Sequence, residues 1–145
     1  MLVRQILKSK PNQKILTAKP EDSVDAGMKI LAKHRIGAVI VSVDGNNVDG
    51  ILSERDIVRE IASRGVGCLD DAISTVMTKK VTACAPGDTA VSILETMTRG
   101  RFRHMPVVED GRLVGVISIG DVVKARIDEV EHENSALTDM IAGNA

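Results

Sequence analysis

The sequence predicts a mixed α+β (α/β) fold built from two copies of one unit, each in the order leader, helix, strand, strand, helix. Three observations predict it. The 145-residue chain repeats short motifs at a nearly constant interval, each copy changes from helical to strand periodicity, and the same Ser-x-x-Asp step follows both strand pairs. A sheet of two or three strands would leave an apolar face exposed, so we expect the two copies to pack face to face as one module.

The internal repeat is visible in three pairs of segments that carry the same residue types in the same order. These pairs are residues 3–7 with 73–77, 20–23 with 86–89, and 50–58 with 115–123. The interval between partners changes only in 8–14 and 46–47, where loops are expected. The repeat therefore predicts a first unit over residues 1–66, a second over 67–127 and a helical tail over 128–145.

Each unit begins with an apolar leader and a helix. The leaders are residues 15–18 and 81–85, and Ser23 or Thr89 is the expected helix N-cap. The apolar stripes of the two helices, and the glycines expected near their ends, are Val24, Met28, Leu31 and Gly37, then Val91, Leu94, Met97 and Gly100. The pattern favours one amphipathic helix in each unit.

Two apolar runs follow each helix and predict a β-hairpin. In the first unit they cover 38–43 and 48–52, and in the second 105–108 and 113–117, with an Asp-Gly pair in each connection. A second helix is then expected to start at Ser53 or Ser118. The tail is compatible with a helix up to Ile141, and Val130, Leu137 and Ile141 could share one face of it. That face could dock a partner or could be a packed or frayed end.

Composition and charge exclude some classes of partner. The formal net charge is -1 and Phe102 is the only aromatic residue. This gives no reason to expect a nucleic-acid or membrane partner, because phosphate backbones attract strongly basic surfaces and single strands need aromatic stacking platforms. Cys68 and Cys84 form no Cys-x-x-Cys pair, and no secretory leader or membrane span is recognisable. We therefore expect a cytoplasmic protein.

The Gly-x-x-Ser-x-x-Asp motif occurs twice and suits a sugar phosphate. A serine at a helix start can bind phosphate together with free N–H groups, and an aspartate one turn later can accept both hydroxyl protons of a ribose. For one such motif taken alone, a plain capping box is the better explanation. Two copies after matching strands favour the ligand-binding interpretation for Ser53 with Asp56 and Ser118 with Asp121.

These features resemble the paired cystathionine-β-synthase (CBS) repeat, or Bateman module, over roughly residues 1–127. The resemblance implies a pseudo-twofold disc with two clefts that accept AMP, ADP, ATP, S-adenosylmethionine or NAD(H), with no catalytic cofactor. It implies ribose contacts for Asp56 and Asp121, and adenine contacts for the leaders, often across the two repeats. With the cations discussed next, the expected nucleotide-binding residues are Thr17, Lys19, Gly37, Ala38, Val39, Ser53, Arg55, Asp56, Thr82, Cys84, Arg103, His104, Met105, Pro106, Ser118 and Asp121.

The two clefts are not expected to be equal. Arg55 brings a guanidinium to the first motif, whereas the second motif has no charge beside Ser118 and would depend on Arg103 and His104 from before its strand. Arg103 could instead serve solubility, and His104 could be a half-buried core residue. The second leader also has Ala83 in the place of Thr17. We expect one tighter and one weaker or different site.

Catalysis is not expected. His34, His104 and His132 are far apart in sequence, with no Cys or carboxylate at metal-ligand spacing, and no nucleophile elbow, phosphate loop or Gly-x-Gly-x-x-Gly occurs. The first hypothesis is a regulatory adenine-nucleotide sensor that forms a homodimer and acts on an unknown partner protein. The second is a structural module that dimerises through apolar helix faces and keeps vestigial clefts.

Overall fold

The structure, a computed structural model, describes residues 1–10 and 14–143. Its helices are α1 (Val3–Ser9), α2 (Val24–His34), α3 (Glu54–Arg64), α4 (Ala90–Gly100) and α5 (Ile119–Ile141), with two short 3-10 helices, η1 (Val66–Asp70) and η2 (Ile73–Thr75). Its strands are β1 (Thr17–Ala18), β2 (Ala38–Val41), β3 (Gly50–Ser53), β4 (His104–Glu109) and β5 (Arg112–Ser118). The order confirms the mixed fold with a repeated unit.

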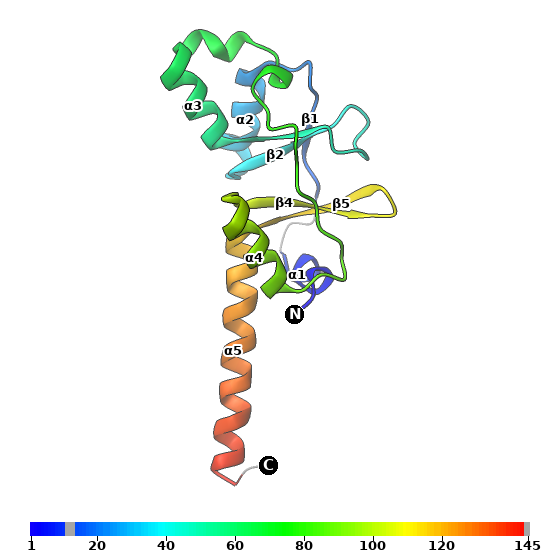
Figure 1. Ribbon diagram of the computed structural model, residues 1–145, viewed down its shortest axis with the longest axis vertical. Helices are drawn as coiled ribbons and strands as arrows, with labels where there is room; N and C mark the ends of the chain where they lie inside the picture. The colour runs from blue at the N-terminus through cyan, green and yellow to red at the C-terminus, as the bar shows by residue number, and fades with distance from the viewer. Residues whose placement is uncertain (11–13, 144–145) are drawn as a thin grey trace.

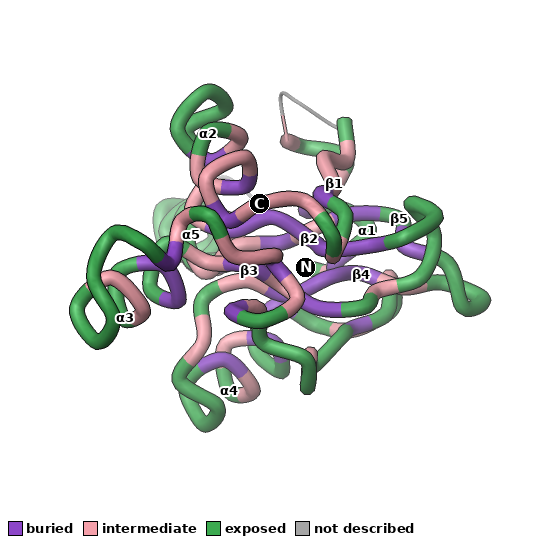
Figure 2. The backbone as a smooth tube through the Cα atoms, turned by 90° about the horizontal axis from the view of Figure 1, so that it is seen from above, coloured by how far each residue is buried: buried purple, intermediate pink, exposed green. Residues whose placement is uncertain are grey.

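Two small sheets lie beside each other in the middle of the molecule (Figure 1). One has the order β1-β2-β3, and the other pairs β4 with β5. The hairpins are equivalent, since Ala38 pairs with Ser53 and His104 pairs with Ser118. Helices α2 and α3 lie beyond the first sheet, and α1, α4 and α5 beyond the second (Figure 1). Viewed from above, the strands form a mostly buried centre (Figure 2).

The first helix of each repeat is capped as expected, but the apolar stripe of the second helix differs from the prediction. Ser23 Oγ accepts from the N–H of Ala26, and Thr89 Oγ1 accepts from that of Ser92. The expected apolar stripe of the second helix was wrong at Val91, which is exposed, and the buried positions are Ala90, Ile93 and Met97. They match the buried Val24, Gly27 and Leu31 of the first helix.

Neither of these helices ends on a glycine in the left-handed conformation. Arg35 and Arg101 are the C-cap residues, with φ of 53° and 57°. Gly100 is the last residue of α4, and Gly37 lies beyond the turn with its C=O accepting from the N–H of Glu54. The sequence-based expectation of C-terminal glycines therefore had the right region and the wrong residue.

Two segments upstream of the predicted leaders, α1 and the η2 segment with Val76, are exchanged between the repeats, and we call them the exchanged leaders. Val3 and Ile6 of α1 pack in the core of the second repeat with Ala90 and Ile93, although α1 precedes the first repeat. Ile73 packs correspondingly in the core of the first repeat, together with Val76 and residues of α2, β2 and β3. The local apolar pattern did not indicate this exchange, because either core could accept either leader.

Matching backbone hydrogen bonds fix the two exchanged leaders. The N–H of Val3 donates to Asp88 O (2.9 Å), and that of Ala90 donates to Met1 O (2.9 Å). At the equivalent place in the other repeat, Ile73 N–H donates to Asp22 O (2.8 Å) and Val24 N–H to Asp71 O (2.9 Å). Because each core is completed by the other repeat's leader, the module should unfold as one cooperative unit.

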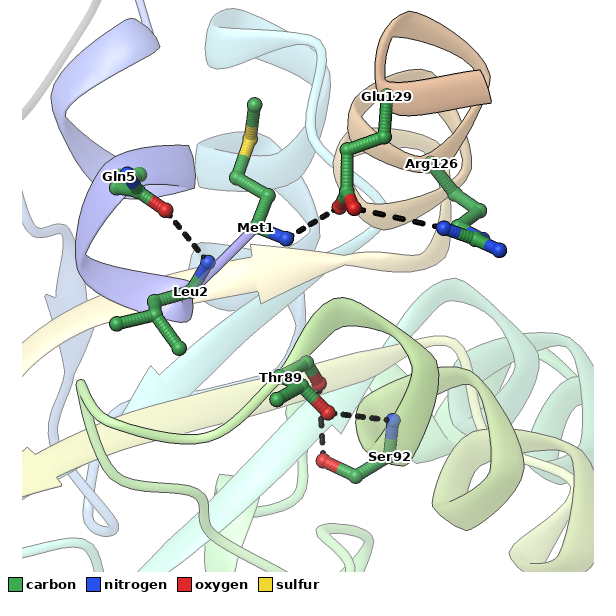
Figure 3. A network of polar contacts seen from close by, with 7 residues as sticks. All are labelled: Met1, Leu2, Gln5, Thr89, Ser92, Arg126 and Glu129. Carbon is green, nitrogen blue, oxygen red and sulfur yellow. Dashed lines mark hydrogen bonds and ion pairs between the residues drawn. The ribbon is translucent and has the colours of Figure 1, made fainter. Parts of the chain in front are cut away.

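Polar contacts tie the start of the chain to α5. Figure 3 shows the α-amino group of Met1 paired with Glu129, which also contacts Arg126, while the N–H of Leu2 donates to Gln5 Oε1. Helix α5 is continuous, so the second helix of the second repeat and the expected tail are one element that projects far from the sheets (Figure 1). Among the described helices, none has the length and apolar character needed to cross a membrane.

Candidate functional site

A cavity of about 570 Å³ lies between the two repeats. This volume falls in the range of small-molecule sites. The residues that line it come from both repeats: Leu7, Lys8, Lys10, Lys14, Ile15, Leu16, His34, Arg35, Ile36, Gly37, Ala38, Ile40, His104, Val114, Gly115, Val116, Ser118 and Asp121. The cavity thus combines the first repeat's leader with the second repeat's Ser-x-x-Asp motif.

The start of α5 forms one wall of the cavity and is closed by a reciprocal cap. Ser118 Oγ accepts from the N–H of Asp121 (3.1 Å), and Asp121 Oδ2 accepts from the N–H of Ser118 (2.9 Å). Ser53 and Asp56 form the same box at the start of α3. Both motifs are therefore helix caps. A carboxylate accepts several hydrogen bonds, so capping leaves it able to receive ligand hydroxyls as well.

Lys10, just beyond α1, reaches across the cavity to this cap. Its Nζ lies 3.0 Å from Asp121 Oδ2 and donates to Val116 O (2.9 Å). Burial opposes ionisation of Asp121, but the N–H of Ser118 and the ammonium of Lys10 outweigh burial and lower the pKa of this carboxyl. Asp121 is therefore a carboxylate at neutral pH.

The ionisable residues of the cavity lining are mainly basic. Lys8, Lys10, Lys14, His34, Arg35 and His104 all contribute to it. Among the described residues that line the cavity, Asp121 is the only acidic one. Burial lowers the pKa of His104, while Glu54 and Asp121 act in the opposite direction. An anionic group away from Asp121, and hydroxyls next to it, would complement this distribution of charge.

The equivalent motif of the first repeat is closed. The side chain of Asp56 is 6% exposed, against 24% for Asp121. Thr78 pairs with Ile51 of β3 through reciprocal backbone hydrogen bonds, and its Oγ1 lies 3.4 Å from Asp56 Oδ1. Arg59 Nη1 approaches the same oxygen at 3.8 Å. Protein groups thus occupy the face of Asp56 that corresponds to the open cavity at Asp121.

The structure brings five of the expected site residues to the cavity: Gly37, Ala38, His104, Ser118 and Asp121. Thr17 and Lys19 line a separate, shallower hollow with Asp22, Ser42 and Asp44. Arg55, Thr82 and Arg103 are exposed, and Ser53 lies with Asp56 in the closed motif.

The remaining expected residues lie inside the strands or beside them. Val39, Met105 and Pro106 are buried. Cys84 is also buried, its Sγ lies 3.7 Å from Pro106 O, and burial raises the pKa of its thiol to about 12. These side chains support the wall of the site from within the core.

Sequence reasoning missed most of the cations in the cavity. Lys8, Lys10 and Lys14 lie in or beside a segment that was interpreted as a loop, and His34 and Arg35 were not among the expected site residues. Their signal was the basic character of residues 4–14 directly before the first leader. A Cβ at Gly115, the glycine of the second motif, would lie 2.8 Å from Leu7 of α1, so the glycine admits the exchanged leader.

Comparison with known proteins identifies the repeated unit. The family model described as CBS domain matches residues 3–63 and again 73–128. The mitochondrial CBS domain-containing protein CBSX3 of Arabidopsis thaliana is 32% identical over 127 residues, which cover 85% of this chain and 62% of that protein. The chain thus spans less than two thirds of the length of this curated relative.

Solved structures show the same fold. The CBS-domain containing protein ATU1752 from Agrobacterium tumefaciens is 45% identical, with a TM-score of 0.82 over 87% of this chain and 99% of that chain. The CBS domain protein PAE2072 from Pyrobaculum aerophilum, complexed with AMP, is 26% identical, with a TM-score of 0.73 over 83% and 89%. The CBS domain pair of protein MJ0100 was solved in complex with 5'-methylthioadenosine and S-adenosyl-L-methionine. It is 27% identical, with a TM-score of 0.76 over 89% of this chain and 98% of that chain. The chain therefore belongs to the CBS-domain family and carries two CBS repeats.

Proposed function

We propose that this CBS pair is a regulatory module that binds an adenine nucleotide in the cavity at Asp121 and has no catalytic activity of its own. The observation that carries the proposal is the charge distribution of the cavity, with one carboxylate at the start of α5 among six basic or imidazole side chains. The adenosine ligands of two related CBS pairs, AMP in one and a methylthioadenosine with S-adenosylmethionine in the other, support the same class of ligand.

The chemistry of the lining assigns a place to each part of the ligand. Asp121 accepts the ribose hydroxyl protons, because a carboxylate has only acceptor atoms. Negative phosphates avoid Asp121 and bind near His34, Arg35 and the lysines. The base lies between aliphatic side chains such as Leu16 and Val116, since the described lining contains no aromatic residue.

Ligand binding would change the contacts of Lys10, which connects α1 to the cavity. Lys10, just beyond the end of α1, is joined to Asp121 and Val116. Ribose hydroxyls at Asp121 compete with this ion pair, and a phosphate offers Lys10 a new partner. Since α1 packs on the second repeat, the change would be transmitted to the exchanged leader. A ligand regulates only if it binds the two arrangements with different affinity.

The shared adenosine unit leaves AMP, ADP, ATP, NAD(H) and S-adenosylmethionine as candidates. We also propose a reducing compartment such as the cytoplasm, because both cysteines are free and buried. The regulated protein would be recognised through the module's outer helices.

The test is calorimetry of the purified protein with AMP, ADP, ATP, NADH and S-adenosylmethionine, with GMP as the control for base recognition. We expect at least one adenine ligand to bind with one site per chain, and GMP to bind more weakly. Folded protein that binds none of the five would overturn the proposal. Turnover of ATP or NADH would contradict its non-catalytic part.

A second candidate is an interaction module whose clefts are vestigial. The closed motif at Asp56, with Thr78 and Arg59 against its carboxylate, favours this for one of the two clefts. An assembled protein with no response to any adenine ligand would support it.

A further inference from the structure

The outer half of α5 is an isolated helix with apolar side chains in solvent. Every residue from Val130 to the end of the helix is exposed, and Leu137 and Ile141 are 58% and 82% exposed. Helices of about 12 residues are marginally stable in water when nothing packs against them. A partner helix would therefore stabilise this segment, which projects far from the sheets (Figure 1).

The apolar residues of α5 follow the spacing of a coiled coil. Intervals of four and three residues alternate without a break along Val123, Ile127, Val130, Asn134, Leu137 and Ile141. Ile127, Asn134 and Ile141 take heptad position a, and Val123, Val130 and Leu137 take position d. The one polar residue, Asn134, is at an a position, where asparagine specifies the register of two-stranded coiled coils. A solvated tail would not require this pattern.

These six residues form a seam that the rest of the protein leaves accessible to another helix. Val122 and Ala125 are the buried residues of α5 and mark the side that faces α4 and α1. At about 100° per residue, the seam lies about 130°, roughly a third of a turn, around the helix from that side. Two helices paired in parallel along the seam would therefore carry their bodies on opposite sides of the coil, without a clash.

We propose that α5 forms a parallel, in-register, two-stranded coiled coil with α5 of a second copy of this chain. Charge supports a second copy as the occupant. In a parallel pair, the g position of one helix faces the following e position of its partner. These positions are Arg126 and Glu131, so two opposite-charge pairs form across the symmetric dimer.

Antiparallel pairing fits less well. An antiparallel pair that covered the whole seam would place Glu131 and Glu133 each opposite its own copy, and like charges repel. A shorter antiparallel overlap removes this repulsion but leaves Leu137 and Ile141 uncovered. The parallel arrangement covers all six seam residues and places Asn134 of one copy beside Asn134 of the other. This proposal is independent of the nucleotide cavity.

Sedimentation velocity of the full chain tests the assembly. We expect a dimer for the natural protein. Leu137→Lys should weaken dimerisation about 100-fold or more, because each dimer loses two buried leucines. Ala136→Lys adds the same charge one residue earlier, away from the seam, and should change the dissociation constant less than about threefold. A dimer that resists Leu137→Lys would place the interface on the disc and overturn the proposal, as would a monomeric natural protein.

Disulfide formation tests the orientation. Leu137→Cys should form an interchain disulfide under mild oxidation, because residues at d face their own copies in a parallel pair. Ala136→Cys is the matched control and should remain reduced. The natural cysteines, Cys68 and Cys84, are buried and should not contribute. The parallel coil would be excluded if both variants formed the disulfide equally. It would also be excluded if Leu137→Cys formed a stable dimer without any interchain disulfide.

Discussion

Asp56 and Asp121 hold equivalent positions in the two repeats and make the same reciprocal cap with Ser53 and Ser118. Their surroundings differ. At Asp121 the carboxylate opens onto a cavity and meets the ammonium of Lys10, whereas Asp56 is covered by Thr78 and approached by Arg59. The motif alone therefore does not determine whether a cleft is open.

The segment that follows each exchanged leader accounts for the difference between the two clefts. After η2 the chain becomes extended, and Thr78 pairs with Ile51 of β3. Helix α1 instead continues to Ser9, and Lys10 reaches the equivalent strand through its side chain only. A paired backbone fills the first cleft, and a flexible side chain leaves the second accessible.

The largest expected effects come from the exchanged leaders. Ile6→Ala and Ile73→Ala each remove a buried side chain from the opposite repeat's core, and each should lower the free energy of unfolding by about 2–5 kcal/mol. Denaturant unfolding followed by circular dichroism measures this. Val66→Ala, at a residue that is 70% exposed, is the control and should change it by less than about 0.5 kcal/mol. Two separate transitions in either variant would contradict a single cooperative unit.

Ligand binding should separate the two aspartates next. Asp121→Asn keeps an acceptor for the cap but removes the charge at the ribose position, and should weaken adenine-nucleotide binding about 10- to 100-fold. Asp56→Asn makes the same change in the closed motif and should alter affinity less than about threefold. Calorimetry on both variants makes the comparison. Equal losses of affinity in the two variants would show that both clefts bind the nucleotide and would contradict the difference between them.

Lys10 should affect ligands according to their charge. Lys10→Met removes a cation from the cavity and should weaken ATP binding by roughly 3- to 10-fold, in keeping with one partly exposed charge–phosphate contact. Adenosine, which lacks phosphates, should lose no affinity and should gain a little, because Lys10 no longer competes with the ribose for Asp121. An equal loss for both ligands would show that Lys10 shapes the cavity and does not bind phosphate.

The smallest expected effect is a pH dependence from His104, whose place in the first repeat is held by Ala38. Burial lowers the pKa of His104 below 6.5, its ordinary value, so the unfolded chain binds this proton more readily than the folded one. The free energy of unfolding should therefore fall as pH drops from about 6.5 towards the folded pKa, and stay level above 6.5. Denaturant unfolding in this range measures the slope, and His104→Gln should reduce it. An unchanged slope would assign it to other groups.

Much of the fold follows from local pattern in the sequence. The Asp-Gly turns, the alternating apolar runs and the Ser-x-x-Asp steps predicted two hairpins, each followed by a capped helix, and the structure confirms them. Asp110 and Gly111, for example, both adopt positive φ in the second turn. These features depend on neighbours in the chain, so one sequence is enough to reveal them.

The site was less predictable because it depends on contacts between distant segments. Asp121 and Ser118 were expected, but Lys10 reaches them only because α1 crosses to the second repeat. Arg55 looked like the better phosphate ligand by sequence distance, yet its side chain is exposed and outside the cavity lining. Thr78 gave no local sign that it would cover Asp56.

The leader exchange also constrains when the protein can fold during its synthesis. Helix α1 is the first described element to leave the ribosome, yet its core partners Ile93 and Val122 are made about 100 residues later. At roughly 5–20 residues per second, α1 waits about 5–20 s with Val3 and Ile6 exposed. The first repeat likewise lacks Ile73 until the second has begun. The first core can therefore close only after the start of the second repeat has been made, and the second core only after Val122 of α5 has been made.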